Sequence, residues 1–283
     1  MSSEPEAIGR TIQLFLVDGT PNGLMIASIH GWTGSVLVAN QANFPRLLAR
    51  AELDRTGVYF LFGPDPIDAL SMRAYIGEAD SVRDRISQSA AERAFWETAV
   101  AVTTSDEALT KGHVRYLEAR LIGIAGKAGR VHLDNGQTPK AEKRSLPEAD
   151  RANMEAFLAN IRVILPVIGF DILKDRPAAA MTKASSAPLA GQIRFEIQHK
   201  SGVQATGTEE NGEFVVLQGS QALKDAGYQG ANSYGDLKRE LMAQGVLVEV
   251  SDGNRFVFSR GNCSSGSGRG SVMGLGAVAH GWA

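Results

Sequence analysis

The sequence predicts an α+β protein in which a small mixed or antiparallel sheet is flanked by helices, with a small α+β module after it. Three observations support this fold class. Both β-prone runs and apolar patterns of helical spacing occur within the first 173 residues. Residues 174–191 are rich in Ala, Ser and Pro and have no apolar period, which is typical of a linker. Strand and helix patterns then resume over residues 192–260.

The composition is that of an ordinary globular protein. Hydrophobic residues make up 43% of the 283 residues, enough for a buried core and, by length, for about two domains. A formal net charge of −2 gives no global support for nucleic-acid binding, so any phosphate partner needs a local cluster of charge. The single cysteine, Cys263, excludes an internal disulfide and a multi-cysteine zinc site.

The beginning of the chain is polar and acidic, which is unlike a secretory signal. No apolar run approaches the roughly 18 residues that a membrane-spanning helix needs. We therefore expect a cytoplasmic protein without a membrane partner.

Residues 1–49 are expected to extend or cover the sheet. Three strands are predicted from β-prone runs, at 11–17, 24–29 and 35–39. A short helix is predicted at 43–51, with Pro45 near its start.

The core domain is expected over residues 50–173. Its strands are predicted at 57–62, 74–79 and 99–104. Its helices are predicted from apolar stripes, at 80–100, 105–125 and 148–168. Ser81 with Asp84, and Thr104 with Glu107, have the spacing of N-terminal capping pairs for the first two helices.

The C-terminal module is expected over residues 192–260. Its predicted elements are strands at 193–198, 203–208 and 212–220, a helix at 233–247 and a hairpin at 248–259. Residues 261–283 are rich in Gly and Ser and carry little charge, so we expect a poorly ordered tail.

Two aromatic-glycine tripeptides point to chemistry in the core domain. Gly57-Val58-Tyr59 and Tyr75-Ile76-Gly77 lie on neighbouring predicted strands, which could place both phenols on one wall. Arg85, near the start of the following helix, could grip two phosphate oxygens with its planar fork. The glycines beside the tyrosines would let a large ligand approach the backbone. Two phenols, a guanidinium and an open backbone together are suited to binding a phosphodiester group.

Glu118 is the second informative residue. It lies four residues from both Val114 and Ile122, within the apolar stripe of its predicted helix. A carboxylate turned inward is costly unless it is paired or binds a cation. One carboxylate, together with water and phosphate oxygens, is a normal way to hold Mg²⁺.

Together these residues resemble the GIY-YIG nuclease family. The resemblance covers residues 50–136 and rests on both tripeptides, on Arg85 and Glu118, and on Asn135, which stands where the family often has a late asparagine. Residues 192–258 resemble an uncharacterised module that follows GIY-YIG domains in bacterial proteins, although the last 23 residues depart from its usual ending.

The resemblance implies a divalent-metal-dependent endonuclease that hydrolyses phosphodiester bonds in nucleic acid, DNA rather than RNA. It implies that Glu118 holds one Mg²⁺ or Mn²⁺ ion and that Arg85 stabilises charge on phosphorus. Tyr59 would act as the general base or position it, and Tyr75 would orient water or phosphate.

Each of these residues also has a structural interpretation. Tyrosines on strands commonly pack with a hydrogen-bonded tip. Arg85 could pair with Asp80 or Asp84, and Glu118 with Arg115 or Arg120. Four further side chains have open roles. His113 could aid proton transfer or lie on the surface, Asn135 could order its loop, and Lys111 and Arg115 could contact phosphate or face water.

The alternative function is a non-catalytic nucleic-acid-binding or assembly protein that keeps the fold. The near-neutral charge favours it. An inward carboxylate argues against it, because a binding protein has no need of one.

Overall fold

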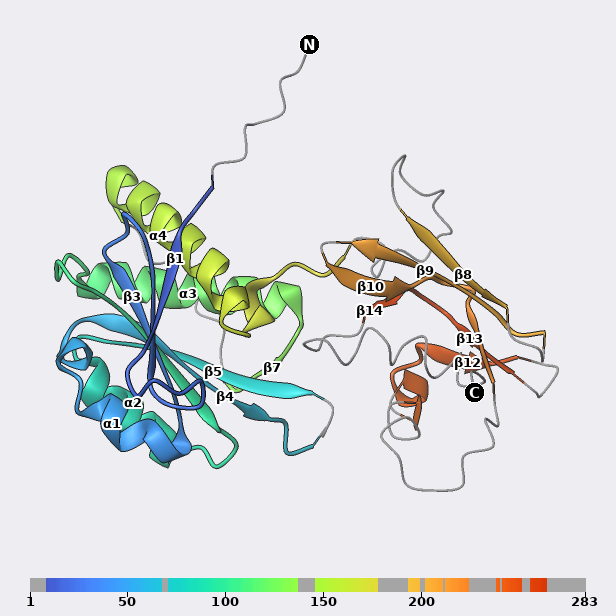
Figure 1. The fold of residues 1–283 in the computed structure, drawn as a ribbon, viewed down its shortest axis with the longest axis horizontal. Coiled ribbons are helices and arrows are strands. Elements are labelled where there is room, and N and C mark those ends of the chain that lie inside the picture. The colour runs from blue at the N-terminus through green and yellow to red at the C-terminus, as the bar shows by residue number, and fades with distance from the viewer. Residues whose placement is uncertain are drawn as a thin grey trace, which may run out of the picture. The chain divides into compact units, whose positions relative to one another are not determined.

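The chain divides into two compact units, residues 1–174 (unit 1) and 175–283 (unit 2). A computed structural model describes residues 9–67, 71–136, 146–177, 193–198, 202–210, 212–223, 238–239, 241–250 and 255–263. Among these residues, no helix is long and apolar enough to cross a membrane. The protein has the predicted α+β fold: unit 1 has a large, mostly antiparallel sheet flanked by helices, and unit 2 has smaller sheets (Figure 1).

Unit 1 is built on a seven-stranded sheet with the order β1-β2-β3-β6-β4-β5-β7. Its strands are β1 (Ile12–Leu16), β2 (Met25–Ile29), β3 (Gly34–Asn40), β4 (Gly57–Pro64), β5 (Met72–Ala79), β6 (Thr98–Thr104) and β7 (His132–Leu133). All neighbours pair antiparallel except β5 and β7, which are parallel. The three N-terminal strands therefore extend the sheet through the β3–β6 pair.

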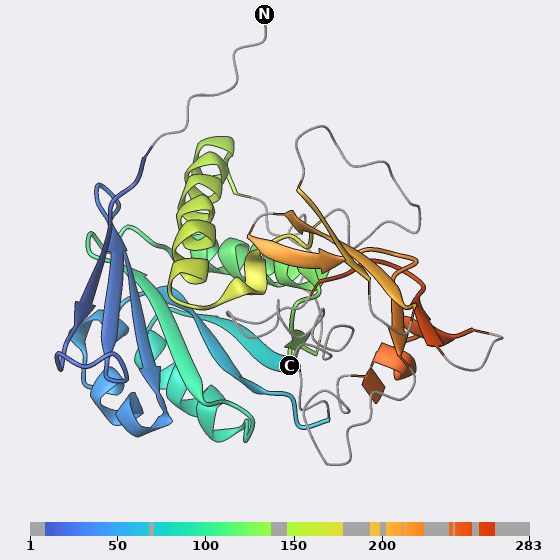
Figure 2. The same ribbon diagram turned by 45° about the vertical axis from the view of Figure 1, so that its right-hand side comes forward.

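Helices cover both faces of this sheet (Figures 1 and 2). α1 (Phe44–Leu48) and α2 (Val82–Ala91) pack on one face, and α3 (Lys111–Ala128) and α4 (Glu148–Val167) on the other. Alternation along β4 divides its side chains between two cores: Phe60 packs with α3 and α4, and Tyr59 packs with α2. The two cores fix α2 and α3 against β4 and β5, whereas α1 packs on β3 and α4 packs on α3 and β2.

α2 is shorter than the helix predicted at 80–100. It ends at Ala91, where the indole N–H of Trp96 donates to the carbonyl of Ala90 at 2.9 Å. The backbone N–H of Glu97 then bonds to the carbonyl of Phe62, which leads the chain into β6. Ser81 is the N-cap residue as expected, but its side chain makes no capping hydrogen bond, so the predicted pairing with Asp84 is wrong.

α3 begins later than the predicted helix at 105–125. The predicted capping box at Thr104 and Glu107 is wrong, because Thr104 is still part of β6 and pairs with Gly34 of β3. The capping box is formed instead by Thr110 and His113. The helix therefore begins at Lys111, six residues or about 1.7 turns after its predicted start at residue 105.

α4 agrees with the predicted helix at 148–168. Its apolar stripe packs against α3 and the sheet, with Ile161, Ile164 and Leu165 fully buried. The chain leaves it through Gly169, whose φ of +93° suits a residue without a Cβ.

Unit 2 has two small antiparallel sheets among its described residues. One has the order β14-β10-β9-β8 and the other β11-β13-β12. Their strands are β8 (Arg194–Gln198), β9 (Gln204–Glu210), β10 (Glu213–Val216), β11 (Gln221–Leu223), β12 (Leu247–Glu249), β13 (Arg255–Phe258) and β14 (Asn262–Cys263). The hairpin predicted at 248–259 corresponds to β12 and β13. Of the helix predicted at 233–247, residues 238–239 and 241–243 are helical, residues 244–246 form a turn and bend, and Leu247 already begins β12, while residues 233–237 and 240 lie outside the described residues. The linker predicted at 174–191 and the tail predicted at 261–283 lie largely outside the described residues.

Candidate active site

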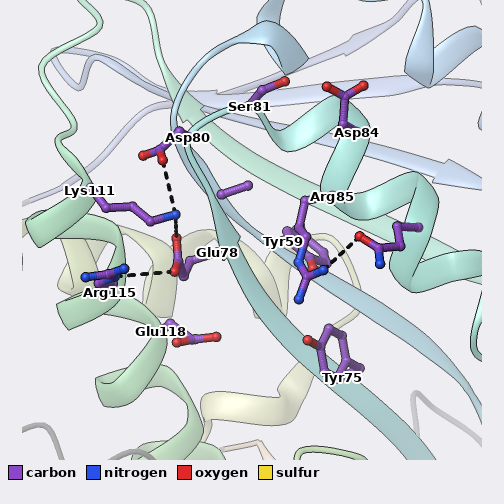
Figure 3. A pocket seen from close by; sticks show the side chains of 12 residues that line it. Tyr59, Tyr75, Glu78, Asp80, Ser81, Asp84, Arg85, Lys111, Arg115 and Glu118 are labelled. Atoms are coloured by element: carbon purple, nitrogen blue, oxygen red, sulfur yellow. Dashed lines mark hydrogen bonds and ion pairs between the residues drawn. The ribbon is translucent and has the colours of Figure 1, made fainter.

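A pocket of ≈ 440 Å³ lies at the outer edge of β5, where α2 and α3 reach it from opposite faces of the sheet. It is lined by Tyr59, Tyr75, Glu78, Ala79, Asp80, Ser81, Asp84, Arg85, Gln88, Lys111, Arg115 and Glu118. Figure 3 shows β5 between the two helices, with Lys111, Arg115 and Glu118 on one side and Arg85 on the other. The four residues on which the predicted mechanism rests thus line a single pocket.

The sheet leaves this edge open because β7 is short. It pairs only with Arg73 and Ala74 at one end of β5. Asn135 then continues the pairing for one residue: its side-chain oxygen accepts from the N–H of Ile76 at 3.1 Å, and its amide donates to the Ile76 carbonyl at 2.7 Å. Beyond Ile76, the edge of β5 faces the pocket.

Tyr59 forms the floor of the pocket. Its side chain is fully buried, and its hydroxyl lies 2.7 Å from the Ser89 hydroxyl on α2. Burial raises the pKa of Tyr59 well above its usual value near 10, although the Ser89 hydrogen bond acts in the opposite direction. Tyr59 is therefore held as a neutral phenol in the folded protein.

The two motif glycines serve packing, which corrects their expected role in ligand approach. A Cβ on Gly77 would lie 2.4 Å from Cζ and from the hydroxyl oxygen of Tyr59, because that ring lies across Gly77. A Cβ on Gly57 would lie 2.4 Å from the carbonyl oxygen of Val102. Protein atoms already occupy both spaces, so neither glycine leaves room for a ligand.

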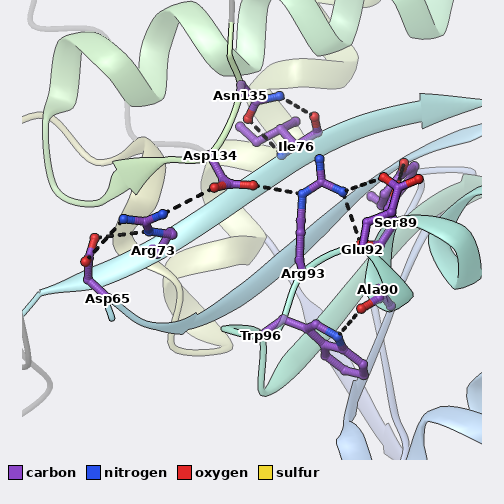
Figure 4. Close-up of polar contacts among 11 residues, drawn as sticks. Asp65, Arg73, Ile76, Ser89, Ala90, Glu92, Arg93, Trp96, Asp134 and Asn135 are labelled. Carbon is purple, nitrogen blue, oxygen red and sulfur yellow. Dashed lines mark hydrogen bonds and ion pairs between the residues drawn. The ribbon is translucent and has the colours of Figure 1, made fainter. Parts of the chain in front are cut away.

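Tyr75 lies beside Tyr59, with 6.1 Å between ring centroids, and is only partly buried. The guanidinium of Arg93 stacks on the Tyr75 ring, with its Cζ 3.6 Å from the ring centroid. The Nε of Arg93 donates to Asp134 at 2.9 Å, and one terminal nitrogen donates to the Ser89 carbonyl at 3.1 Å (Figure 4). Tyr75 is therefore fixed through its ring face.

Arg85 is exposed and extends over the pocket from α2 (Figure 3). Its guanidinium donates to the side-chain oxygen of Gln88 at 2.8 Å, one turn along the same helix. Asp80, one of its expected ion-pair partners, is 3.3 Å from Lys111 instead. Because the contact with Gln88 is an exposed one, the guanidinium can exchange it for an anionic ligand.

The α3 side of the pocket combines positive and negative groups. Lys111, Arg115 and Glu118 follow one another at helical spacing, so all three point to the pocket. The Lys111 ammonium lies 2.9 Å from Glu78, and the Arg115 Nε lies 3.8 Å from it. Burial lowers the pKa of Lys111, but its hydrogen bonds with Glu78 and Asp80 outweigh burial and raise it overall.

Glu118 is half-buried on this same face of α3. One of its expected partners, Arg120, is engaged elsewhere: it donates two hydrogen bonds, of 2.6 and 3.0 Å, to Glu155 of α4. Glu118 faces the pocket and is less buried than Val114 and Ile122, its neighbours in the apolar stripe.

Two accessory candidates lie outside the pocket. His113 accepts from the Thr110 N–H at 3.2 Å in the capping box, and its other ring nitrogen lies 3.8 Å from Asp150. Asn135 pairs with the backbone of Ile76, as described above, so it orders its segment. Both side chains have structural partners and do not line the pocket.

Sequence reasoning missed three residues at or near this site: Glu78, Ser89 and Arg93. Glu78 follows directly after the second tripeptide, and Ser89 lies four residues after Arg85 on the same helix. Helical spacing from Arg85 could have placed Ser89 near the pocket. No local signal marks Arg93, because its position depends on Asp134, which is 41 residues away.

Comparison with known proteins bears on unit 2. Residues 195–283 match a protein-family model described as a domain of unknown function (DUF4357). No curated protein and no solved structure matches the chain. Unit 1, which contains the pocket, lies outside the matched range.

Proposed function

We propose that unit 1 is a GIY-YIG-type endonuclease that hydrolyses phosphodiester bonds in nucleic acid, specifically DNA, with the help of one divalent cation. One observation carries this proposal: Tyr59, Tyr75, Arg85 and Glu118 come from two strands and two helices and line the same pocket. Two phenols, a guanidinium and a carboxylate are the groups needed to orient water, neutralise a phosphate and bind an ion.

The donor groups of the pocket fit a single Mg²⁺ or Mn²⁺ ion. Among the described residues, no group of three or more His, Cys, Asp or Glu side chains could hold a metal, so a closed all-protein site is not expected there. Mg²⁺ commonly uses one or two carboxylates, and water and substrate phosphate complete its shell. Glu118 would supply that carboxylate. A bound ion would polarise the phosphate and stabilise charge on the leaving oxygen.

The two tyrosines have different roles in this proposal. The raised pKa of the buried Tyr59 keeps its proton in place, so Tyr59 positions its neighbours through hydrogen bonds and does not accept a proton. Tyr75 is the more accessible phenol and orients the attacking water or the phosphate. Of the two roles expected for Tyr59, acting as the general base or positioning it, the proposal therefore keeps only the second.

Arg85 and the α3 residues would hold the phosphate backbone. Arg85 is exposed at the pocket and would neutralise charge on the scissile phosphate. Lys111 and Arg115 lie on the other side of the pocket and would contact a neighbouring phosphate in exchange for Glu78. The single cysteine suits a reducing compartment, so we place this activity in the cytoplasm, which cell fractionation would test.

A cleavage assay on supercoiled plasmid and on single-stranded DNA, with and without Mg²⁺ or Mn²⁺, tests the proposal. Glu118→Gln keeps the side-chain shape and removes the charge. We expect it to lower the metal-dependent rate by about 100-fold or more, as the loss of one preorganised electrostatic group does elsewhere. Glu97→Gln is the matched control, because Glu97 is exposed and lies outside the pocket.

Equal cutting by Glu118→Gln and the wild type would refute the assignment of Glu118. DNA binding without cutting in either metal would favour the non-catalytic alternative. A lower DNA affinity in Arg85→Met, with Arg46→Met unchanged, would support the phosphate contact at Arg85, since Arg46 pairs with Asp18 outside the pocket.

A further inference from the structure

We propose that Arg93 is the positioning residue for Tyr75, and that it couples the two phenols of the pocket. This inference rests on the proposed function. Arg93 does not line the pocket. It acts from behind Tyr75, through the face of the ring.

The guanidinium of Arg93 stacks on the ring of Tyr75. At 3.6 Å from the ring centroid, the guanidinium carbon of Arg93 is in van der Waals contact with the ring of Tyr75. The Arg93 side chain is only 16% exposed, so solvent screens the interaction weakly. A planar guanidinium on the ring face limits the rotation of the ring, and with it the direction of the phenol oxygen.

Arg93 is itself held in place by a chain of ion pairs that begins at Asp134. Asp134 accepts from Arg93 at 2.9 Å and from Arg73 at 3.3 Å, and Arg73 also pairs with Asp65 at 3.2 Å (Figure 4). The Asp65 side chain is fully buried, and the backbone N–H of Asp134 bonds to the Ala74 carbonyl at 2.8 Å. Alternating charges thus tie the guanidinium to the same strand that carries Tyr75.

Arg93 is also connected to Tyr59, through Ser89. Arg93 donates to the carbonyl of Ser89 at 3.1 Å, and the Ser89 hydroxyl holds the hydroxyl of Tyr59 at 2.7 Å. One guanidinium therefore stabilises the ring of Tyr75 and the helical turn that holds Tyr59. A change at Arg93 should disturb the relative geometry of both phenols.

Single-turnover cleavage kinetics with the full-length chain test this role. We expect Arg93→Met to lower the maximal rate about 10-fold with an unchanged DNA concentration at half-maximal rate, because the residue does not touch DNA. Arg93→Lys keeps the charge but not the planar fork and should recover only part of the rate. Arg46→Met, in an ion pair with Asp18 outside the pocket, is the matched control.

A double-variant cycle with Tyr75→Phe separates positioning from simple packing. Phenylalanine keeps the stack with Arg93 but has no hydroxyl. If Arg93 acts mainly through that hydroxyl, Arg93→Met lowers the rate by much less than 10-fold in the Tyr75→Phe background, and the remaining effect is transmitted through Ser89 to Tyr59. An undiminished 10-fold loss in that background would overturn the proposal.

A readout independent of cleavage is the ¹⁹F NMR spectrum of protein labelled with 3-fluorotyrosine. The Tyr75 signal is assigned as the one that disappears in Tyr75→Phe. We expect it to shift or broaden in Arg93→Met and stay in place in Arg46→Met. Should the wild type prove inactive, this spectrum still decides the positioning role, and an unmoved signal would refute it. If Arg93→Met fails to fold, Asp134→Ala removes the carboxylate that Arg93 shares with Arg73 and is expected to give the same change in the signal, so an unmoved signal there also refutes the role.

Discussion

Replacing Gly77 by alanine perturbs the pocket with a single methyl group. Gly77 lies directly opposite Tyr59 in the β4–β5 register. Its new Cβ would meet Cζ and the hydroxyl oxygen of Tyr59 at 2.4 Å and Cε1 at 2.8 Å. No carbon–carbon contact survives at such distances, so the end of the ring must move away from the strand.

The magnitude follows from three contributions. Overpacking a close-packed core destabilises a protein by about 1–3 kcal/mol. Moving the ring also breaks its hydrogen bond with Ser89, which contributes about 1 kcal/mol. In the opposite direction, replacing glycine by alanine inside a strand favours folding by roughly 0.5–1 kcal/mol. The net expectation is a loss of about 1–3.5 kcal/mol in the free energy of unfolding of unit 1.

Urea unfolding followed by tryptophan fluorescence measures this loss. The variants are made in a Trp282→Phe background, so that the signal comes from Trp32 and Trp96 of unit 1. Gly123→Ala is the matched control: it lies inside α3 with nothing within 4 Å of a new Cβ, and should stabilise by about 1 kcal/mol.

The clash with the ring is tested by repeating Gly77→Ala in a Tyr59→Val background. Without the ring, the added methyl meets no aromatic atom, so we expect no destabilisation or a small gain. A loss of the same size in both backgrounds would refute the reasoning, and so would a Gly77→Ala protein as stable as the wild type.

Two further predictions concern the surroundings of the pocket. Asn135→Ala removes both side-chain hydrogen bonds to Ile76 and should destabilise unit 1 by about 1–3 kcal/mol; hydrogen exchange at the Ile76 amide should accelerate, and unchanged exchange would contradict the pairing. Hydrogen bonding by Arg120 lowers the pKa of Glu155 below its usual 4.5 despite partial burial, with Tyr116 contributing in the same direction. The ionised Glu155 therefore stabilises the folded state. Its contribution is fully present above pH 4.5, the usual pKa of glutamate, and is lost as the pH falls through the lowered pKa of the folded protein. The difference in unfolding free energy between wild type and Glu155→Gln should therefore shrink from pH 7 to pH 3, and a constant difference would argue against it.

Local patterns in the sequence determined the identity and order of most elements in unit 1. The strands β4 and β5 and the helix α4 all follow from periodicity within one segment, as does the side of α3 on which Glu118 lies. A period of two or of 3.6 residues is set by the backbone, so it can be read without knowing the rest of the chain. The four residues that carry the proposed chemistry were identified in this way and by resemblance.

Tertiary contacts decided where the helices begin and end. Thr104 and Glu107 have the spacing of a capping box, but pairing with Gly34 keeps Thr104 in β6 and delays α3 until Thr110. In the same way, the indole of Trp96 contacts the last turn of α2 at Ala90. Each boundary depends on a side chain or strand that a local pattern does not contain.

Only the tertiary structure could assign the glycines and the supports of the tyrosines. Gly77 is small because the ring of Tyr59, 18 residues earlier, lies across it. Arg93 reaches Tyr75 because Asp134, 41 residues later and directly after β7, holds it. Such contacts join segments that are distant in sequence, and their geometry exists only once the sheet has brought those segments together.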